Sequence, residues 1–312
     1  MLPVLHELEQ TFAPSPLVRI NDDKWAAHQV ELWLKRDDLL HPIISGNKWR
    51  KLKYILNHAL SLEKDTVVSM GGAYSNHLHA LAYAGKMLGI KTVGFVRGEP
   101  AIALTPTLHD AKTWGMELRY VTRTDYRLLR QYKDFDSLPN LTARQYWLPE
   151  GGAHSLALQG VAELVAEIDI PYDTVCVACG TGTTLAGIVS AVPEQANVLG
   201  IAALKHADFL NADVQVLFTI PRYNWHIHQA YHFGGYAKTN AALLAFIEEF
   251  KFKTKISLEP VYTGKMMYAL YDLLGQGYFK PGQRIVAIHT GGLQGNRGDI
   301  NEQNIRTGIN GG

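Results

Sequence analysis

The feature that most constrains the fold is a repeated alternation of short apolar runs with helical patterns. "TVVSM" (66–70) precedes a glycine turn, a segment in which Asn76, Ala80 and Ala84 recur at four-residue steps, and then "KTVGFV" (91–96). This spacing predicts a helix between two strands, which is a parallel βαβ unit. Further strands are expected at "MELRYV", "DTVCVA", "NVLGIAAL" and "RIVAIHT". The alternation predicts an α/β protein with twisted, parallel-type sheets flanked by helices, and a site at the carboxyl ends of strands.

The chain is long enough, at 312 residues, for two domains that each bury a core. We expect a small α/β domain at 50–150 and a larger one made of 1–49 and 151–312. The polar segment 122–145 is expected to connect the domains. The segment 205–240, rich in histidine and aromatic residues, is expected to pass over a site.

The charge balance excludes some classes of function. Lys plus Arg is 30 and Asp plus Glu is 29, so the formal net charge is +1. Global charge therefore favours neither a nucleic-acid partner nor a membrane surface. Apolar runs fall short of the roughly 18 residues that span a membrane, and the N-terminus lacks a signal-peptide pattern. We expect a cytoplasmic protein.

Two motifs resemble redox or metal sites but favour packing. Cys176 and Cys179 form a C-x-x-C spacing on an expected strand, where residues three apart point to opposite faces. A redox pair normally lies at a helix start, and zinc would need further ligands. His226, His228 and His232 lack an accompanying carboxylate pattern, which favours a site wall or aromatic packing. No metal is expected.

A glycine-rich loop follows one expected strand. "VACGTGTTLAG" (177–187) lacks the Gly-Lys-Ser/Thr ending of a P-loop, and Leu185 replaces the third glycine of G-x-G-x-x-G. What remains is a strand, a loop and a helix start, where converging N–H groups and threonine hydroxyls suit one compact phosphate. A simple tight turn is the alternative. The loop residues are Gly180, Thr181, Gly182, Thr183 and Thr184.

Two other strand ends carry weaker signals. In "MGGAYSNHLHALA" (70–82), Ser75 and Asn76 lie where a loop enters a helix, so either could serve only as its N-cap. In "IHTGGLQG" (288–295), Thr290 lies at a strand end beside paired glycines.

The stretch "ISGNKWRKLKYIL" places Lys48, Arg50, Lys51 and Lys53 within six positions. A solvated helix face would explain them. Lys48 and Lys51, however, are three apart and share a face, where their like charges repel. A phosphate nearby would turn that repulsion into attraction. This is the arrangement that a lysine needs to bind an aldehyde cofactor covalently.

Together these motifs resemble one family. "SGNKWRKL" is similar to the cofactor-lysine motif of the 1-aminocyclopropane-1-carboxylate (ACC) deaminase and D-cysteine desulfhydrase family, which are pyridoxal-phosphate enzymes of the tryptophan synthase β-like fold. "GGAYSNH", "LPEGGAHSLALQG", "GTGTTLAG", "EPVYTGKMMYAL" and "IHTGG" follow in the family's order. The resemblance spans most of the chain. It implies that fold, pyridoxal 5'-phosphate as cofactor and a homodimer.

The resemblance also implies roles for single residues. Lys48 would attach the cofactor covalently and Lys51 would lie near its phosphate. Asn76 would hydrogen-bond the cofactor's phenolic oxygen, while Ser75 would contact the substrate carboxylate or shuttle a proton. The loop residues Gly180, Thr181, Gly182, Thr183 and Thr184 would hold the phosphate. Tyr262 would face the substrate, and Thr290 would meet the pyridine nitrogen.

One departure from the family pattern bears on the substrate. Members that open the cyclopropane ring typically carry glutamate after the active-site tyrosine, whereas Tyr262 is followed by Thr263, as in the desulfhydrases. The segment 223–238 is a second departure. We expect α,β-elimination from a small D-amino acid, with D-cysteine giving pyruvate, ammonia and sulfide. ACC deaminase is the alternative within the family, and a non-catalytic phosphate-ligand binding protein is the alternative outside it.

Overall fold

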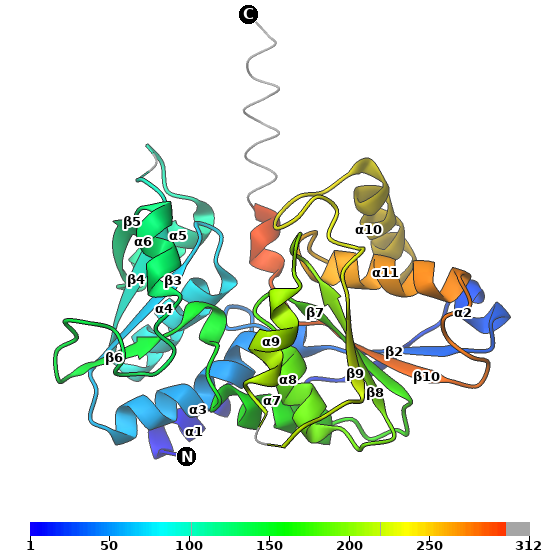
Figure 1. Cartoon of the computed structure of the whole chain (residues 1–312), viewed down its shortest axis with the longest axis horizontal. Coiled ribbons are helices and arrows are strands. Elements are labelled where there is room, and N and C mark those ends of the chain that lie inside the picture. The colour runs from blue at the N-terminus through cyan, green and yellow to red at the C-terminus, as the bar shows by residue number, and fades with distance from the viewer. Residues whose placement is uncertain (101, 219, 298–312) are drawn as a thin grey trace, which may run out of the picture. The chain divides into compact units, whose positions relative to one another are not determined.

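The structure is a computed structural model that describes residues 1–100, 102–218 and 220–297. Contacts divide the chain into two compact units, each described here by itself (Figure 1). Unit 1 comprises Met1–Phe12, Leu52–His154 and the described residues from Gly292 onward, and unit 2 comprises Ala13–Lys51 and Ser155–Gly291. Unit 1 shares 52–150 with the expected small domain. It also contains two terminal segments that were expected in the larger domain.

The helices and strands alternate along most of the chain. The helices are α1 (Pro3–Glu9), α2 (Asp23–Ala27), α3 (Asn47–Ser61), α4 (Asn76–Leu88), α5 (Pro106–Thr113), α6 (Arg123–Leu129), α7 (Ala157–Ala166), α8 (Thr183–Ala191), α9 (Phe209–Gln215), α10 (Ala241–Thr254) and α11 (Thr263–Gly275), with short 3-10 helices η1 (Asp37–Leu39), η2 (Glu150–Gly152) and η3 (Leu293–Gly295). The strands are β1 (Leu17–Ile20), β2 (Glu31–Lys35), β3 (Thr66–Gly71), β4 (Lys91–Arg97), β5 (Glu117–Val121), β6 (Gln145–Leu148), β7 (Thr174–Cys179), β8 (Asn197–Ala202), β9 (Trp225–His228) and β10 (Arg284–Ile288).

Unit 1 is built on a parallel sheet with the strand order β5-β4-β3-β6. The predicted βαβ unit is confirmed, because β3, α4 and β4 follow one another and the two strands pair in parallel. The segment 122–145 was expected to connect domains, and that prediction is wrong. The segment lies inside unit 1 and contains α6. Although the segment is mostly polar, Tyr126 attaches it to the rest of unit 1. The Tyr126 side chain is buried, and its hydroxyl donates to Glu150 (2.6 Å).

Unit 2 is built on a sheet with the order β1-β2-β10-β7-β8-β9, in which only β1 and β2 pair antiparallel. Alternate residues of β7 enter two cores. Cys176 packs in the core formed with α10 and α11, and Cys179 in the core formed with α7, α8 and α9. Both cysteines are buried, as predicted, and burial raises the pKa of the Cys179 thiol to about 12. High thiol pKa values keep these side chains protonated and unreactive.

Across the described ranges, every helix is too short or too polar to cross a membrane. The segment 205–240 belongs to unit 2 and contains α9 and the edge strand β9, neither of which the sequence pattern predicted.

Candidate active site

The basic stretch forms the first turns of α3, and it is not a solvated face. Arg50, Lys51 and Lys53 are 4%, 3% and 4% exposed. Lys53 donates to Glu9 (2.7 Å) within unit 1. Burying a cation is unfavourable unless it has a partner or a function, so these side chains require a specific explanation.

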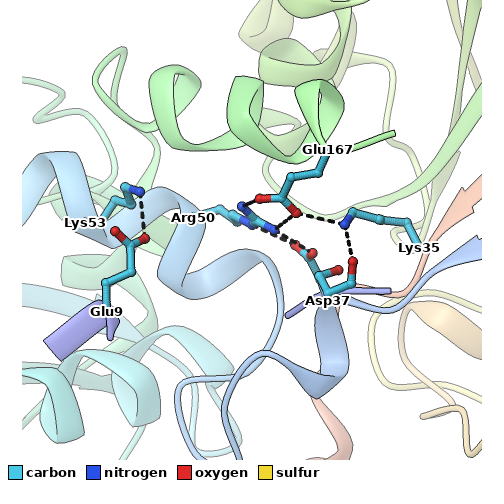
Figure 2. Close-up of polar contacts among 7 residues, drawn as sticks. Glu9, Lys35, Asp37, Arg50, Lys53 and Glu167 are labelled. Atoms are coloured by element: carbon cyan, nitrogen blue, oxygen red, sulfur yellow. Dashed lines mark hydrogen bonds and ion pairs between the residues drawn. The ribbon is translucent and has the colours of Figure 1, made fainter. Parts of the chain in front are cut away.

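Arg50 fixes the start of α3 in unit 2 (Figure 2). Its guanidinium donates through Nε and Nη2 to Asp37 (3.2 and 3.0 Å) and through Nη2 to Glu167 (2.7 Å). Glu167 also accepts from Lys35 (2.8 Å). The backbone of α7 also lies close to the backbone of α3. A Cβ added to Gly160 of α7 would lie 1.8 Å from the Arg50 carbonyl oxygen. This anchoring sets where α3 presents the side chains of its first turn.

Lys48 is linked to the phosphate-loop candidate through one side chain. Its Nζ donates to Asn47 Oδ1 (3.1 Å), and Asn47 Nδ2 donates to Thr184 Oγ1 (2.8 Å). Burial lowers the pKa of Lys48 to about 8, although the charge of Glu259 opposes this shift. Burial and the charge of Lys48 together hold the pKa of Lys51 well below its ordinary value. A bound anion would stabilise the protonated forms of both amines, so this pair of lysines forms a site that is suited to an anion.

The glycine–threonine loop lies between the end of β7 and the start of α8. Gly182 has φ +76°, a conformation that glycine adopts readily, and it is the N-cap of α8. Thr183 and Thr184 are buried in the first turn, and the Thr181 and Thr183 hydroxyls are 3.2 Å apart. The first N–H groups of a helix have no intrahelical partner. The loop therefore presents N–H and hydroxyl donors in one place.

Two further predicted residues lie beside these elements. Gly46 has φ +66°, and a Cβ added there would lie 1.9 Å from the Thr290 carbonyl oxygen, so only glycine permits this approach of the residue before α3 to the loop after β10. A Cβ added to Gly180 would lie 3.0 Å from the Tyr262 ring. Unit 2 thus brings together Lys48, the loop, Tyr262 and Thr290.

Ser75 and Asn76 belong to unit 1. Ser75 is the N-cap of α4, and its Oγ accepts from the Leu78 N–H (3.2 Å), which leaves the hydroxyl hydrogen available for donation. Asn76 Oδ1 accepts from Gln294 Nε2. The amide nitrogen of Asn76 is then oriented as a donor, which is the role that a phenolic oxygen acceptor requires.

Sequence reasoning missed Asn47 and Glu259. Glu259 is 2% exposed and accepts from the N–H groups of Val261 (2.7 Å), Tyr262 (2.8 Å) and Thr263 (2.6 Å). An available signal was a lone carboxylate in the apolar run before Tyr262.

The segment 205–240 is attached to α11 by Lys265. This buried amine donates to the carbonyl oxygens of Ala203 (3.3 Å), His232 (2.9 Å) and Gly235 (2.8 Å). Tyr236, on the same segment, contacts Tyr262 edge-to-face with ring centroids 6.2 Å apart. Sequence reasoning did not single out Lys265 or Tyr236.

The histidines of this segment take part in packing and turn contacts. The rings of His226 and His228 are 6.0 Å apart, and His228 lies 5.0 Å from the ring of Tyr231. His232 Nδ1 accepts from the Gly234 N–H (2.9 Å). Within the described part of the chain, no cluster of three or more His, Cys, Asp or Glu residues could hold a metal ion.

The chemistry of these donors fits pyridoxal phosphate. The aldehyde needs an amine that is readily deprotonated, and the pKa of about 8 gives Lys48 a much larger neutral fraction near physiological pH than an ordinary lysine has. The phosphate needs clustered donors, which the start of α8 offers, and a nearby amine whose protonation its negative charge would favour, which Lys51 offers. Gly46 lies against the backbone of Thr290 and Gly180 lies against the Tyr262 ring, so neither position has room for a side chain.

We expect the Thr183→Val and Thr184→Val double variant to bind the cofactor at least tenfold more weakly. It loses two hydroxyl donors to a charged phosphate, at about 1.5–3 kcal/mol for each hydrogen bond. The measurement is titration of apoprotein with pyridoxal phosphate. Thr174→Val, at the opposite end of β7, is the matched control. Unchanged affinity in the double variant would show that the loop is only a turn.

Comparisons with known proteins identify the family. The model of the pyridoxal-phosphate dependent enzyme family matches residues 8–291. A Pyrococcus horikoshii protein, provisionally named as an ACC deaminase, is 31% identical over 85% of each chain. The mitochondrial bifunctional D-cysteine desulfhydrase/ACC deaminase of Arabidopsis thaliana is 29% identical over 93% of this chain and 79% of its own.

A crystal structure of an ACC deaminase homologue matches with a TM-score of 0.79 and 27% identity, covering 97% of this chain and 98% of that one. The fold is therefore tryptophan synthase β-like, and pyridoxal phosphate is the cofactor. These matches decide against a non-catalytic phosphate-binding protein. The chain belongs to the pyridoxal-phosphate dependent enzymes, in the family of ACC deaminases and D-cysteine desulfhydrases.

Proposed function

We propose that this enzyme catalyses α,β-elimination from a small D-amino acid, with D-cysteine as the preferred substrate. D-cysteine and water would give pyruvate, ammonia and hydrogen sulfide. The observation that carries the choice is the residue after Tyr262, which is Thr263 rather than glutamate.

The surroundings of Thr263 support this choice. Its side chain is fully buried, and its hydroxyl lies 3.1 Å from Glu259 Oε1 and accepts from the Glu259 N–H (3.0 Å). Position 263 thus contributes a hydroxyl that is engaged within the start of α11. A site without a carboxylate at this position favours departure of a stable β leaving group, such as thiolate, over cleavage of a ring carbon–carbon bond.

Each residue then has a task that its chemistry permits. When bound, pyridoxal phosphate withdraws electrons from the substrate Cα and makes the Cα proton acidic. Lys48 Nζ, with a pKa of about 8, can accept that proton and later release it. The Ser75 hydroxyl would donate to the substrate carboxylate, and the Asn76 amide to the cofactor's phenolic oxygen. Tyr262 would face the substrate, and Thr290 would donate to or accept from the pyridine nitrogen.

The deciding experiment measures kcat/KM on one preparation for D-cysteine, L-cysteine, D-serine, β-chloro-D-alanine and ACC. Pyruvate should form readily from D-cysteine and β-chloro-D-alanine, and slowly or not at all from ACC. A higher value for ACC would overturn the proposal in favour of ACC deaminase, which the names of several relatives favour. Equal kcat/KM values for L- and D-cysteine would contradict the proposed preference for the D enantiomer.

A cytoplasmic location and a homodimer complete the proposal. The homodimer rests on the family resemblance. Size-exclusion chromatography with light scattering tests the dimer, and a monomeric mass would contradict it.

A further inference from the structure

The carboxylate of Glu259 organises the residues around it. It accepts three successive backbone N–H groups, from Val261, Tyr262 and Thr263, and lies 3.1 Å from the Thr263 hydroxyl. In return, the Glu259 N–H donates to Thr263 Oγ1 (3.0 Å), and its carbonyl oxygen accepts from the Gly264 N–H (2.8 Å). This ring of hydrogen bonds closes the N-terminus of α11, where a negative charge is also favoured by the helix dipole.

Tyr262 depends on this ring for its backbone geometry. It is the N-cap of α11 with φ −124° and ψ −70°, outside the regular regions, and its own side chain makes no capping hydrogen bond. Its N–H is held by Glu259. The resulting direction places the phenol beside Gly180, where an added Cβ would be 3.1 Å from the hydroxyl oxygen. A modest rotation of this backbone would move the hydroxyl away from the phosphate loop.

We propose that Glu259 is a positioning residue of the active site, whose buried carboxylate fixes the backbone of Tyr262 and so holds the phenol hydroxyl beside the loop that begins at Gly180. The inference rests on the proposed function, because it takes Tyr262 as the residue that faces the substrate. A second effect follows from its charge. Glu259 favours the protonated amines of Lys48 and Lys265, whose pKa values burial lowers to about 8 in each case.

The test is a double-variant cycle of Glu259→Gln and Tyr262→Phe, assayed by kcat and KM on D-cysteine. Glutamine keeps the size and one acceptor oxygen, but it removes the negative charge and turns an amide NH₂ towards at least one of the three backbone donors, so the ring of hydrogen bonds is weakened and loses at least one member. We expect kcat to fall about tenfold or more when Tyr262 is present. In the Tyr262→Phe background the same change should have a much smaller effect, because no hydroxyl remains to be positioned. Equal losses in the two backgrounds, or no loss, would overturn the inference.

Two measurements on the apoprotein do not depend on turnover. Amide hydrogen exchange at Tyr262 and Thr263 should accelerate in Glu259→Gln. The titration midpoint of the Lys48 amine, followed by NMR after reductive methylation, should move to lower pH, because the carboxylate that stabilises its cation is gone. Unchanged values in both measurements would contradict the assignment. If D-cysteine is not a substrate, these results still decide the role of Glu259, and the cycle is run on the substrate that is turned over.

Two variants separate positioning from general stability. Asn240→Ala removes a side-chain cap from α10, where Asn240 Oδ1 accepts from the Leu243 N–H (2.9 Å), and should leave kcat unchanged. Thr263→Val removes one hydroxyl from the ring of hydrogen bonds, and it replaces Glu259→Gln if that variant fails to fold. Its loss of kcat should be smaller, and should again depend on the Tyr262 hydroxyl. A comparable loss in Asn240→Ala would indicate that destabilisation alone explains the result.

Discussion

Lys48→Ala is expected to abolish turnover and covalent attachment of the cofactor while the fold survives. The amine donates a hydrogen bond to Asn47, and losing that bond should cost the folded state only about 1 kcal/mol. After borohydride reduction of the wild type, peptide mapping should find the pyridoxyl group on Lys48. Finding it on Lys51 or Lys265 would refute the assignment.

Lys265 makes this a demanding test, because burial also lowers its pKa to about 8. Its amine, however, is held by three backbone carbonyl oxygens, so we expect it to be unreactive. The pH dependence provides a second check. Because the neutral amine is the nucleophile, loading of the apoprotein should accelerate as the pH rises towards about 8 and change little above it. A rate that keeps rising to pH 10 would argue for an ordinary, solvated lysine.

Arg50→Met should lower the free energy of unfolding by about 3–5 kcal/mol, because it leaves the Asp37 carboxylate buried without its partner. The readout is the urea midpoint together with the slope of the transition. Arg19→Met is the matched control in unit 2. Arg19 pairs with Glu31 at 3.1 Å but is 53% exposed, so its loss should cost no more than about 1 kcal/mol. Similar losses of unfolding free energy in the two variants would show that the buried network stabilises the protein no more than a surface ion pair does.

The difference in the free energy of unfolding between Arg50→Met and the wild type should become smaller as the pH falls. Burial alone would raise the pKa of Glu167, but its hydrogen bonds from Arg50 outweigh burial and hold that pKa below its ordinary value of 4.5. The pair therefore stabilises the protein above that value and loses its effect as the pH falls below it. Cofactor loading should also weaken in the variant, because Arg50 sets the start of the helix that carries Lys48. A difference in the free energy of unfolding that grows as the pH falls would contradict this account.

The alternation of strands and helices could be predicted from the chain alone because it is written in local periodicity. The strands β3, β4, β5, β7, β8 and β10 all fall on apolar runs that the sequence marks. The glycine–threonine loop was equally visible, since it needs residues that tolerate positive φ, as Gly182 does, and offer hydroxyls. The strands β1, β2, β6 and β9 were not predicted. Three of them, β1, β6 and β9, have only four residues each and are edge strands, so each is too short to show a clear periodicity.

The candidate lysine could also be predicted, but its environment could not. The sequence by itself determined an α/β chain, a phosphate-suited loop and a basic helix start that carries Lys48. Only the tertiary structure decided that Arg50 serves as an anchor and that Asn47 joins Lys48 to Thr184. Arg50 and Glu167 are 117 residues apart, and Asn47 and Thr184 are 137 apart. Such pairings depend on which faces the folded sheet and helices bring together, and no local pattern in the chain encodes that contact.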